Sequence, residues 1–320
     1  MNDIRRTILW VIFGFSMVLL WDQWQIHNGR QATFFPNPAG KPAAVATQPA
    51  ASASGAGTVP APVASTTSPA IPAGQAAAAV PVAPAPAAPR EKIVVTTDVL
   101  KLTFDTEGGS LIRTEFLKYQ DMQDKSRSFV LLDDSKDRVY VAQTGLIGSV
   151  AGADFPTHKT PMKMAGDREL KEGQNELVLT FESAEIGGAK LVKTYTLRRG
   201  AYDMSVRHTV TNTGATPLAP QLYYQLVRDG NKPPGESSFY STFTGPAVYT
   251  EKKKYQKVEF ADIKKKKAEF ETQSGNGYVA VVQHYFASAW LLPDGMQRNI
   301  SMDAVDVGST VPDCCYRATM

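Results

Sequence analysis

Four histidines are the side chains in this chain best suited to acid–base or metal chemistry: His27, His158, His208 and His284. None lies in an HxH or HExxH pattern or beside a pair of carboxylates, so the sequence predicts no metal site. His208 lies on the apolar side of an alternating segment, where a hydrogen-bonded core histidine is the expected role. The same role is expected for His284, which lies in an apolar run. The histidines therefore predict neither a metal centre nor a catalytic base.

The motifs that activate nucleophiles or cradle phosphates are also missing. The sequence contains no GxSxG, no GxxxxGK[ST] and no GxGxxG between a strand and a helix. The two cysteines, Cys314 and Cys315, are adjacent and have no CxxC spacing. We expect them to be two thiols in a disordered tail, which leaves the folded part free of cysteine and suits an oxidising compartment. No catalytic residue, no cofactor and no enzyme activity are expected.

The charge balance argues against a polyanionic partner for the chain as a whole. The 320 residues carry 34 basic and 31 acidic side chains, a net charge of only +3. No whole-protein field therefore favours nucleic acid. Two lysine runs stand out locally, "EKKKYQK" at 251–257 and "DIKKKKAEF" at 262–270. They are expected at solvated edges and loops, with contact to anionic lipid headgroups as the alternative.

The N-terminus has the pattern of an uncleaved signal anchor over residues 1–30. An uncharged apolar run predicts a transmembrane helix at about 7–24, and no A-x-A-like cleavage site follows it closely. Two arginines precede the run, which predicts a cytoplasmic N-terminus and a main domain outside the cytoplasm. The expected anchor residues are Arg5, Arg6 and the interfacial Trp10, Trp21 and Trp24.

Residues 31–90 are dominated by alanine and proline, with almost no charged or aromatic side chain. Such a composition cannot offset the entropy of ordering, and the prolines favour extended conformations. We expect a disordered linker that acts as a spacer between the anchor and a folded domain.

Residues 91–300 alternate apolar and polar side chains in most ordered-looking segments. Examples are "VLKLTFDTEGGSL", "NELVLTFES", "KLVKTYTLRRGAYDMSVRHTVTNTG" and "APQLYYQLVRDG", each bounded by turn residues. Many half-buried strands with short turns predict a mainly β domain, an antiparallel sandwich. About 210 residues exceed a simple immunoglobulin-like unit, so the sandwich is expected to be enlarged.

The apolar run "YVAVVQHYFASAWLL" at 278–292 is too short to cross a membrane as a helix. It suits two short covered strands, with "QHY" as the bend between them. The longer segment "GNGYVAVVQHYFASAW" closely resembles part of the first periplasmic domain in the YidC family of bacterial membrane protein insertases. "TDVLKLTFDTEGGSL", "EGQNELVLTF" and "KTYTLRRGAYDMSVRHTVTNTG" match that family in the same order. The motif residues that carry the resemblance, with an expected structural role, are Tyr278, Gln283, Tyr285, Phe286 and Trp290.

The resemblance covers about residues 1–30 and 91–300, and it implies a galactose mutarotase-like β-sandwich on the periplasmic side of the bacterial inner membrane. It implies work in the insertion and folding of integral membrane proteins, alone or with the Sec translocon. The implied partners are inner-membrane lipids, Sec translocon components and nascent membrane proteins. No cofactor, nucleic acid or small-molecule substrate is implied.

Residues 301–320, "SMDAVDVGSTVPDCCYRATM", do not resemble the family, and no second run of 18 apolar residues exists. The expectation is therefore a truncated or frame-disrupted chain that lacks the family's membrane core. The alternative function is a membrane-tethered carbohydrate-binding or mutarotase-like domain. That alternative predicts a histidine and a carboxylate that converge in a groove.

Overall fold

A computed structural model describes residues 90–148, 154–233 and 242–320, together with Trp10, Phe13, Phe15, Ser16, Val18 and Trp21. The chain divides into two compact units, Met1–Ala53 and Ser54–Met320. In the first unit the six described residues are helical, and Trp10 and Trp21 are exposed. Arg5, Arg6, Trp24, the remainder of the expected span and the linker through residue 89 lie outside the described residues. Among the residues that are described, no helix has the length and hydropathy needed to cross a bilayer.

The second unit is built on an eight-stranded antiparallel sheet with the order β1-β2-β3-β4-β5-β10-β18-β17. Apolar and polar residues alternate along these segments, and in the strands every second side chain tends to be buried. The reason is that successive side chains of a strand point to opposite faces of the sheet. The turn between β2 and β3 contains Gly108 and Gly109, both with positive φ. The strands are β1 (Lys92–Thr96), β2 (Leu100–Asp105), β3 (Ser110–Gln120), β4 (Ser128–Asp134), β5 (Val139–Gly148), β10 (Pro220–Arg228), β17 (Ser301–Ala304) and β18 (Tyr316–Thr319).

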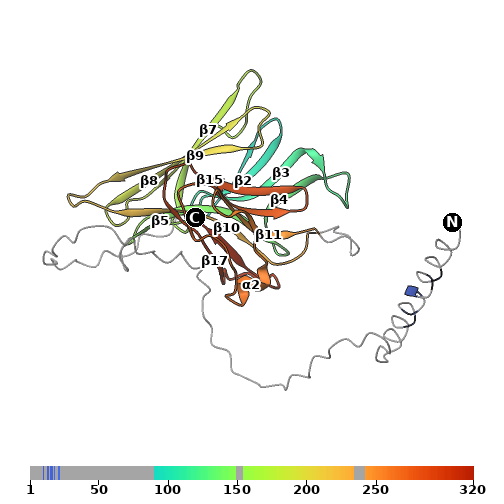
Figure 1. Cartoon of the computed structure of the whole chain (residues 1–320). Helices are drawn as coiled ribbons and strands as arrows, with labels where there is room; N and C mark the ends of the chain where they lie inside the picture. Colours follow the sequence, from blue (N-terminus) through green and yellow to red (C-terminus); the bar gives the residue numbers. More distant parts are fainter. Residues whose placement is uncertain are drawn as a thin grey trace, which may run out of the picture. The chain divides into compact units, whose positions relative to one another are not determined.

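Two smaller antiparallel sheets and a two-stranded ribbon complete the described domain (Figure 1). One small sheet has the order β6-β7-β8-β9 and the other β12-β11-β14-β15. The expected enlarged antiparallel sandwich is confirmed, with one layer split into separate sheets. Their elements are β6 (Met162–Gly166), β7 (Glu176–Ser183), β8 (Ala189–Arg198), β9 (Met204–Asn212), β11 (Thr244–Thr250), β12 (Lys254–Lys257), β13 (Gln273–Ser274), β14 (Tyr278–Gln283), β15 (Phe286–Leu291), β16 (Arg298–Asn299) and the short helix α2 (Phe260–Lys264).

The main core lies between the eight-stranded sheet and the β6–β9 sheet. Phe104 of β2 packs against Phe181 and Tyr195, with ring centroids 5.4 and 4.9 Å apart. All three side chains are at most 3% exposed. Burial of these large rings stabilises the core by the hydrophobic effect, and their tilted contacts add to it. One face of the eight-stranded sheet therefore packs into the main core, and the opposite face does not.

The apolar run at 278–292 forms the hairpin expected from its pattern. β14 pairs with β15, and the connection consists of His284 and Tyr285. His284 has a φ of 54°, a left-handed conformation suited to a two-residue hairpin turn. Val279, Ala280 and Val281 are all buried, so β14 is covered on both faces. The interpretation of this run as two strands with a bend at "QHY" is confirmed. Only β14 is covered on both faces, because side chains of β15 are alternately half-buried and exposed, and Leu291 is 70% exposed.

Residues 301–320 are part of the folded domain, and the expected disordered tail is wrong. β18 lies between β10 and β17 in the eight-stranded sheet, with Tyr316, Ala318 and Met320 all buried. Cys315 is 2% exposed and belongs to a buried cluster that includes Val227 and Val311. The folded part is therefore not free of cysteine. Hydrophobic burial and strand pairing order this segment.

Candidate functional site

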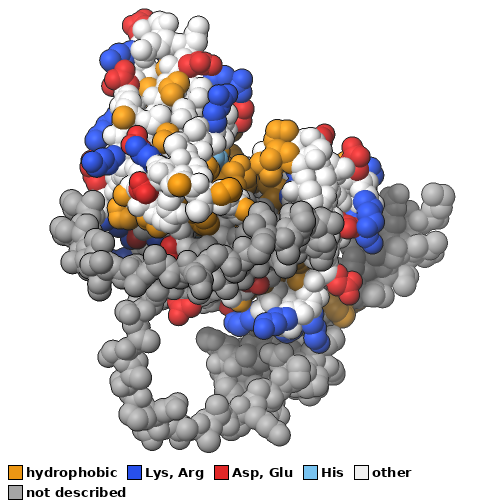
Figure 2. All heavy atoms as spheres, turned by 90° about the vertical axis from the view of Figure 1, so that its left-hand side faces the viewer, with side chains coloured by type: hydrophobic (Ala, Val, Ile, Leu, Met, Phe, Trp, Pro, Cys, Tyr) orange, Lys and Arg blue, Asp and Glu red, His pale blue; other side chains and the backbone are white. Residues whose placement is uncertain are grey.

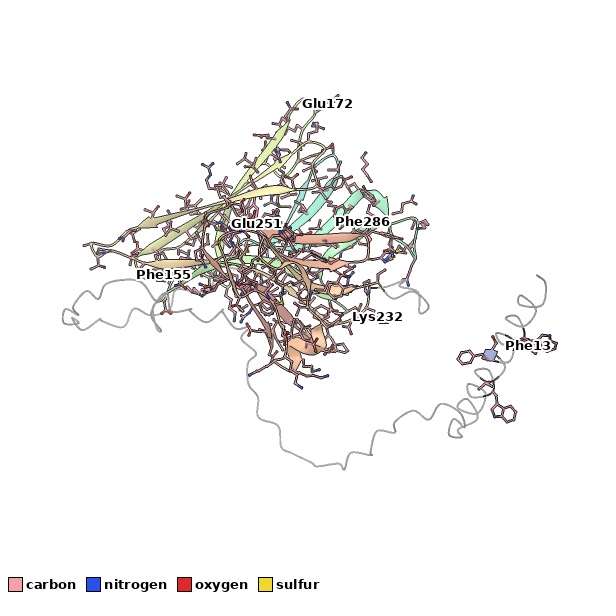
Figure 3. The ribbon with its side chains drawn as sticks, in the orientation of Figure 1. Phe13, Phe155, Glu172, Lys232, Glu251 and Phe286 are labelled. Carbon is pink, nitrogen blue, oxygen red and sulfur yellow. A yellow bond between two sulfur atoms is a disulfide. The ribbon has the colours of Figure 1, made fainter. Side chains whose placement is uncertain are left out.

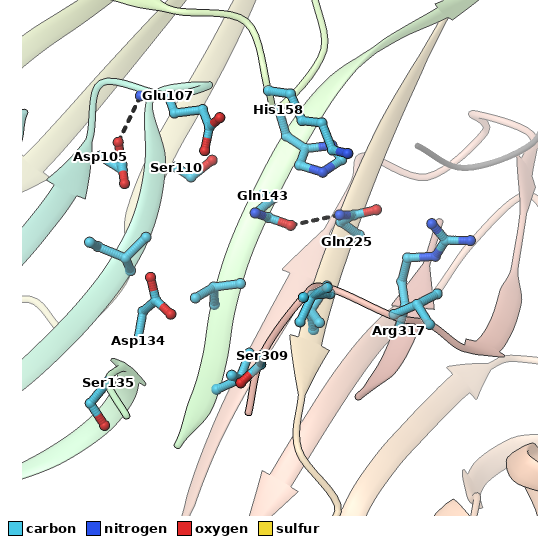
Figure 4. Close-up of a pocket in the computed structure, with 18 of the residues that line it drawn as sticks. Asp105, Glu107, Ser110, Asp134, Ser135, Gln143, His158, Gln225, Ser309 and Arg317 are labelled. Atoms are coloured by element: carbon cyan, nitrogen blue, oxygen red, sulfur yellow. Dashed lines mark hydrogen bonds between the residues drawn. The ribbon is translucent and has the colours of Figure 1, made fainter. Parts of the chain in front are cut away.

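An open groove of about 810 Å³ lies on the face of the eight-stranded sheet that is turned away from the main core (Figure 4). Strand alternation explains which side chains reach it. Leu111 and Leu226 belong to the main core, whereas the next residues along β3 and β10, Ile112 and Val227, line the groove. Residues between β17 and β18, including Val305 and Val307, line a further part of it. The tail thus helps to build the groove.

Arg90 organises the acidic end of the groove. Its Nε donates to Oδ2 of Asp105 at 2.5 Å, and its other nitrogens lie 3.3 Å from Glu107 and 3.9 Å from Asp134. The carboxylate of Asp105 is almost fully buried and also accepts from the backbone N–H of Glu107 at 2.8 Å. Burial opposes the charge of Arg90, but the hydrogen bond and the three carboxylates outweigh it and raise the Arg90 pKa. The acidic side chains are therefore held by a shared cation.

His158 occupies a buried position on another side of the groove. The Tyr223 hydroxyl accepts from the His158 backbone N–H at 3.0 Å and lies 2.6 Å from Nδ1 of the ring. The Tyr223 hydroxyl thus holds both the backbone and the ring of His158. Burial first, and then the nearby cations Lys159, Lys193 and Arg317, lower the His158 pKa to about 3. The imidazole is neutral at physiological pH.

The floor of the groove between these ends carries a pair of amides. Gln225 donates from Nε2 to Oε1 of Gln143 at 2.7 Å. Two buried polar atoms of the groove, Ser110 Oγ and Gln225 Oε1, have no hydrogen-bond partner among the described residues. Most buried polar groups in native proteins are paired, so such atoms are candidates for contact with a ligand. Beside the amides lies an apolar strip formed by Ile112, Val139, Val141, Val227, Val305 and Val307.

The contacts of the groove favour binding over bond-breaking chemistry. A histidine and carboxylates do line the same groove, as the carbohydrate alternative requires. However, Asp105 is bound by Arg90, and the Nδ1 of His158 is bound by Tyr223. A neutral ring with a strongly lowered pKa is a poor general acid. Within the described parts of the chain, no three acidic, histidine or cysteine side chains gather as metal ligands.

His208 and His284 have structural roles, and His27 lies outside the described residues. The Nε2 of His208 lies 2.8 Å from Oγ1 of Thr144, so the expected hydrogen-bonded core histidine is confirmed. Burial, followed by the charge of Lys193, lowers the His208 pKa to about 3. His284 contacts Oγ1 of Thr242 through Nδ1 at 2.8 Å in the hairpin turn. Neither side chain lines the groove.

None of the five motif residues of the β14–β15 hairpin lines the groove, and four of them contact other parts of the domain. Tyr278 stacks on Tyr249, and Gln283 accepts a hydrogen bond from Arg228 at 3.1 Å. Trp290 donates from Nε1 to the backbone oxygen of Gln225 at 3.0 Å, which ties the hairpin to a strand of the groove. Tyr285 is 81% exposed at the turn.

The remaining motif residue, Phe286, joins an aromatic cluster beside β3 and β4 (Figure 3). Its ring stacks on Phe129 with centroids 4.0 Å apart and an interplanar angle of 16°, and it also contacts Phe116 at 5.3 Å. The hairpin is thereby fixed to the large sheet at this end.

The sequence alone did not predict the groove. Its residues come from β1, β2, β3, β4, β5, β10 and β18 and from segments that connect strands. The polar residues on the strands look like ordinary outward-facing strand residues. The only available signal was polar residues, such as Ser110, Gln143 and Gln225, at positions of the alternating strands. That signal does not identify which strands become neighbours.

Comparison with known proteins gives a family match over the whole described domain. Residues 92–318 match the family model described as the YidC periplasmic domain. The match continues beyond residue 300, where we expected the resemblance to end, and that expectation is wrong for residues 301–318.

Curated relatives described as membrane protein insertase YidC match across nearly the entire chain. The protein of Bordetella parapertussis is 54% identical over 311 residues, covering 92% of this chain and 52% of the relative. The proteins of Ralstonia nicotianae and Burkholderia multivorans are 46% and 43% identical, each covering 95% of this chain and 52% of the relative. The chain thus spans about half the length of the curated relatives that it matches.

Proposed function

Since the chain belongs to the family of YidC periplasmic domains, we propose that it takes part in the insertion and folding of integral membrane proteins at a bacterial inner membrane. The observation that carries this proposal is the continuous match over residues 92–318, together with relatives whose printed name is membrane protein insertase. A match along the full length of the domain supports a role in the same process as that named for the relatives. The role proposed is assembly and client contact rather than catalysis.

The proposal includes the topology and partners implied by the N-terminal sequence and by the family. Arg5 and Arg6 precede the apolar run, which favours a cytoplasmic N-terminus, a periplasmic domain and contact with inner-membrane lipids. Trp10, Trp21 and Trp24 serve as interfacial anchors, with residues 31–90 as the spacer. Nascent membrane proteins are the clients, and Sec translocon components are the further partners.

The groove supplies a surface on which a client segment can lie. Extended polypeptide presents both backbone donors and backbone acceptors, which match the unpartnered Ser110 Oγ and Gln225 Oε1. The valine-rich strip beside them accepts apolar side chains. The groove therefore offers both kinds of contact that a partly folded membrane protein carries.

A domain exchange tests the proposal. A full-length relative in which residues 92–318 of this chain replace the corresponding domain is expressed in cells depleted of their own insertase. We expect growth, and we expect protease-accessibility assays to report normal insertion of client proteins. If the hybrid is folded and present in the membrane but inserts no client, the proposed function is wrong.

A tethered carbohydrate-binding domain is the second candidate, because His158, Asp105 and Glu107 line one groove. A ligand that binds only the native state raises the melting temperature by mass action. Sugars at concentrations well above a millimolar dissociation constant should then stabilise the chain, and the variant Gln225→Leu should abolish the shift. An unchanged melting temperature across mono- and oligosaccharides counts against this candidate.

A further inference from the structure

Eight lysines form a basic region around β12 and α2, which we term the lysine surface. One group lies in the β11–β12 turn and along β12, and the other at the carboxyl end of α2. All eight side chains are exposed. In Figure 2 basic side chains gather at the lower edge of the domain, the level at which α2 lies in Figure 1. The members are Lys252, Lys253, Lys254, Lys257, Lys264, Lys265, Lys266 and Lys267.

Most of the lysine surface is not neutralised by the protein itself. Lys252 pairs with Glu271 at 3.1 Å, and Lys264 pairs with Asp313 at 3.0 Å. Lys257 lies over the ring of Phe243. The other five lysines have no ion-pair partner among the described residues. They are Lys253, Lys254, Lys265, Lys266 and Lys267.

The segment that displays these lysines is packed against the domain. Phe260 and Ile263 of α2 are 8% and 3% exposed, and Phe260 lies 4.7 Å from the ring of Tyr316. After the helix, the backbone N–H groups of Lys266 and Lys267 donate to carbonyls of α2 at 3.0 and 2.8 Å. The ammonium groups therefore project from an ordered backbone, which lowers the entropic cost of holding them against a partner.

The arrangement fits an extended anionic surface better than a single anion. The first group of lysines runs from the turn before β12 to the end of β12, whose four residues span roughly 13 Å, and the second group follows at the end of α2. Within the first group, Tyr255 is 44% exposed, an amphipathic ring of the type found at membrane interfaces. The region 251–271 carries eight lysines and five acidic residues, so its attraction to anions is moderate and sensitive to salt.

We propose that the lysine surface docks the domain onto the anionic phospholipid headgroups of the membrane that holds the chain. The proposal rests on the membrane function proposed above and assigns its lipid contact to particular residues. Each lysine close to an anionic leaflet gains attraction from the surface potential, which acts only within about a Debye length. Docking would hold one end of the eight-stranded sheet near the membrane and fix the orientation of the groove.

Hydrogen exchange of the full chain in nanodiscs tests the proposal. The chain is incorporated into discs of phosphatidylcholine alone and into discs that also contain phosphatidylglycerol. We expect backbone exchange in residues 251–271 to be about tenfold slower in the anionic discs, and this protection to disappear near 1 M salt. The triple variant Lys265→Gln, Lys266→Gln, Lys267→Gln should lose it. The matched triple variant Lys118→Gln, Lys125→Gln, Lys163→Gln, which removes three exposed lysines elsewhere, should retain it.

The other outcomes each overturn the proposal. If the backbone of residues 251–271 is protected from exchange equally in neutral and anionic discs, the contact with the membrane does not depend on lipid charge. Equal loss in both triple variants means that net charge, and not this surface, governs docking. Protection in neutral discs on addition of a soluble polyanion, such as heparin, identifies a general polyanion site instead. Failure of the chain to enter discs of either kind contradicts the membrane function itself, which separates that failure from failure of the lysine surface.

Discussion

Lys193 on β8 donates its ammonium group to the backbone oxygen of Thr144 on β5 at 2.7 Å, and so joins two sheets through a fully buried cation. The same group donates to the backbone oxygen of Gly108 at 2.6 Å. At Gly108 a Cβ would lie 2.2 Å from the backbone oxygen of His158, so only glycine permits this approach. Burial lowers the Lys193 pKa to about 7.

The lowered pKa of Lys193 predicts that stability increases with pH in the weakly alkaline range. Between pH 7 and 9 the folded protein loses this proton, whereas an unfolded lysine with a pKa near 10.5 keeps it. The unfolded state then binds more protons, so the free energy of unfolding should rise, by at most about 1.4 kcal/mol per pH unit. Urea unfolding at several pH values measures it.

In this experiment Lys193→Met should remove the rise in stability, because no titrating group remains at the position. Lys190→Met on the same strand is the control, since Lys190 is partly exposed and pairs with Glu182. A rise that persists unchanged in Lys193→Met would show that Lys193 keeps an ordinary pKa.

The lowered pKa of His208 predicts that the folded protein loses stability in weak acid. Its folded pKa is about 3 and its unfolded value about 6.5, so the unfolded state takes up the proton first as the pH falls. The stabilisation is complete above pH 6.5 and decreases toward pH 3, at most about 1.4 kcal/mol per pH unit. The variant His208→Gln should reduce the slope between pH 6.5 and 5 in urea unfolding. A slope that is unchanged in His208→Gln would contradict the prediction.

Two adjacent residues of the β14–β15 hairpin should differ strongly on truncation. Phe286→Ala removes a ring stacked on Phe129 and should lower the free energy of unfolding by about 2–3 kcal/mol, less than for a fully buried ring. Tyr285→Ala, at a position that is 81% exposed, should change it by no more than about 0.5 kcal/mol. Chemical denaturation of both variants provides the comparison. Similar losses in the two would mean that the aromatic cluster does not hold the hairpin.

The role of the tail is tested by placing a charge on its last strand. Ala318 on β18 is 1% exposed, so Ala318→Asp buries a carboxylate and should cost about 3 kcal/mol or more. Ala304 on β17 is exposed, and Ala304→Asp should cost less than about 1 kcal/mol. Circular dichroism during thermal unfolding compares the two. If both variants melt together with the parent chain, residues 316–320 are not part of the cooperative domain.

Local pattern predicted much of the strand layout. The segment that contains β8 and β9 alternates clearly, and its turn residues separate the two strands at the expected place. The bend at His284 was also predicted, because a polar interruption in a short apolar run suits a hairpin turn. These features depend on neighbours in sequence, which is why they could be predicted without the fold.

The tail and the groove could not be predicted in this way. The four residues of β18 have no clear alternation, and they become a strand because β10 and β17 offer edges on both sides. Gln143 and Gln225 meet only because β5 and β10 pair, at positions far apart in the chain. Register between distant strands is set by packing against the whole core.

By itself, the sequence determined the class of fold, the family and the absence of familiar catalytic motifs, since composition, alternation and ordered motifs are properties of the linear chain. Only the tertiary structure decided that residues 301–320 belong to the large sheet, that Lys193 is a buried link between sheets, and that Arg90, His158 and Gln225 share one groove. The physical reason is that burial, lowered pKa values and convergent side chains arise from non-local contacts, whose partners are chosen by the packing of complete sheets.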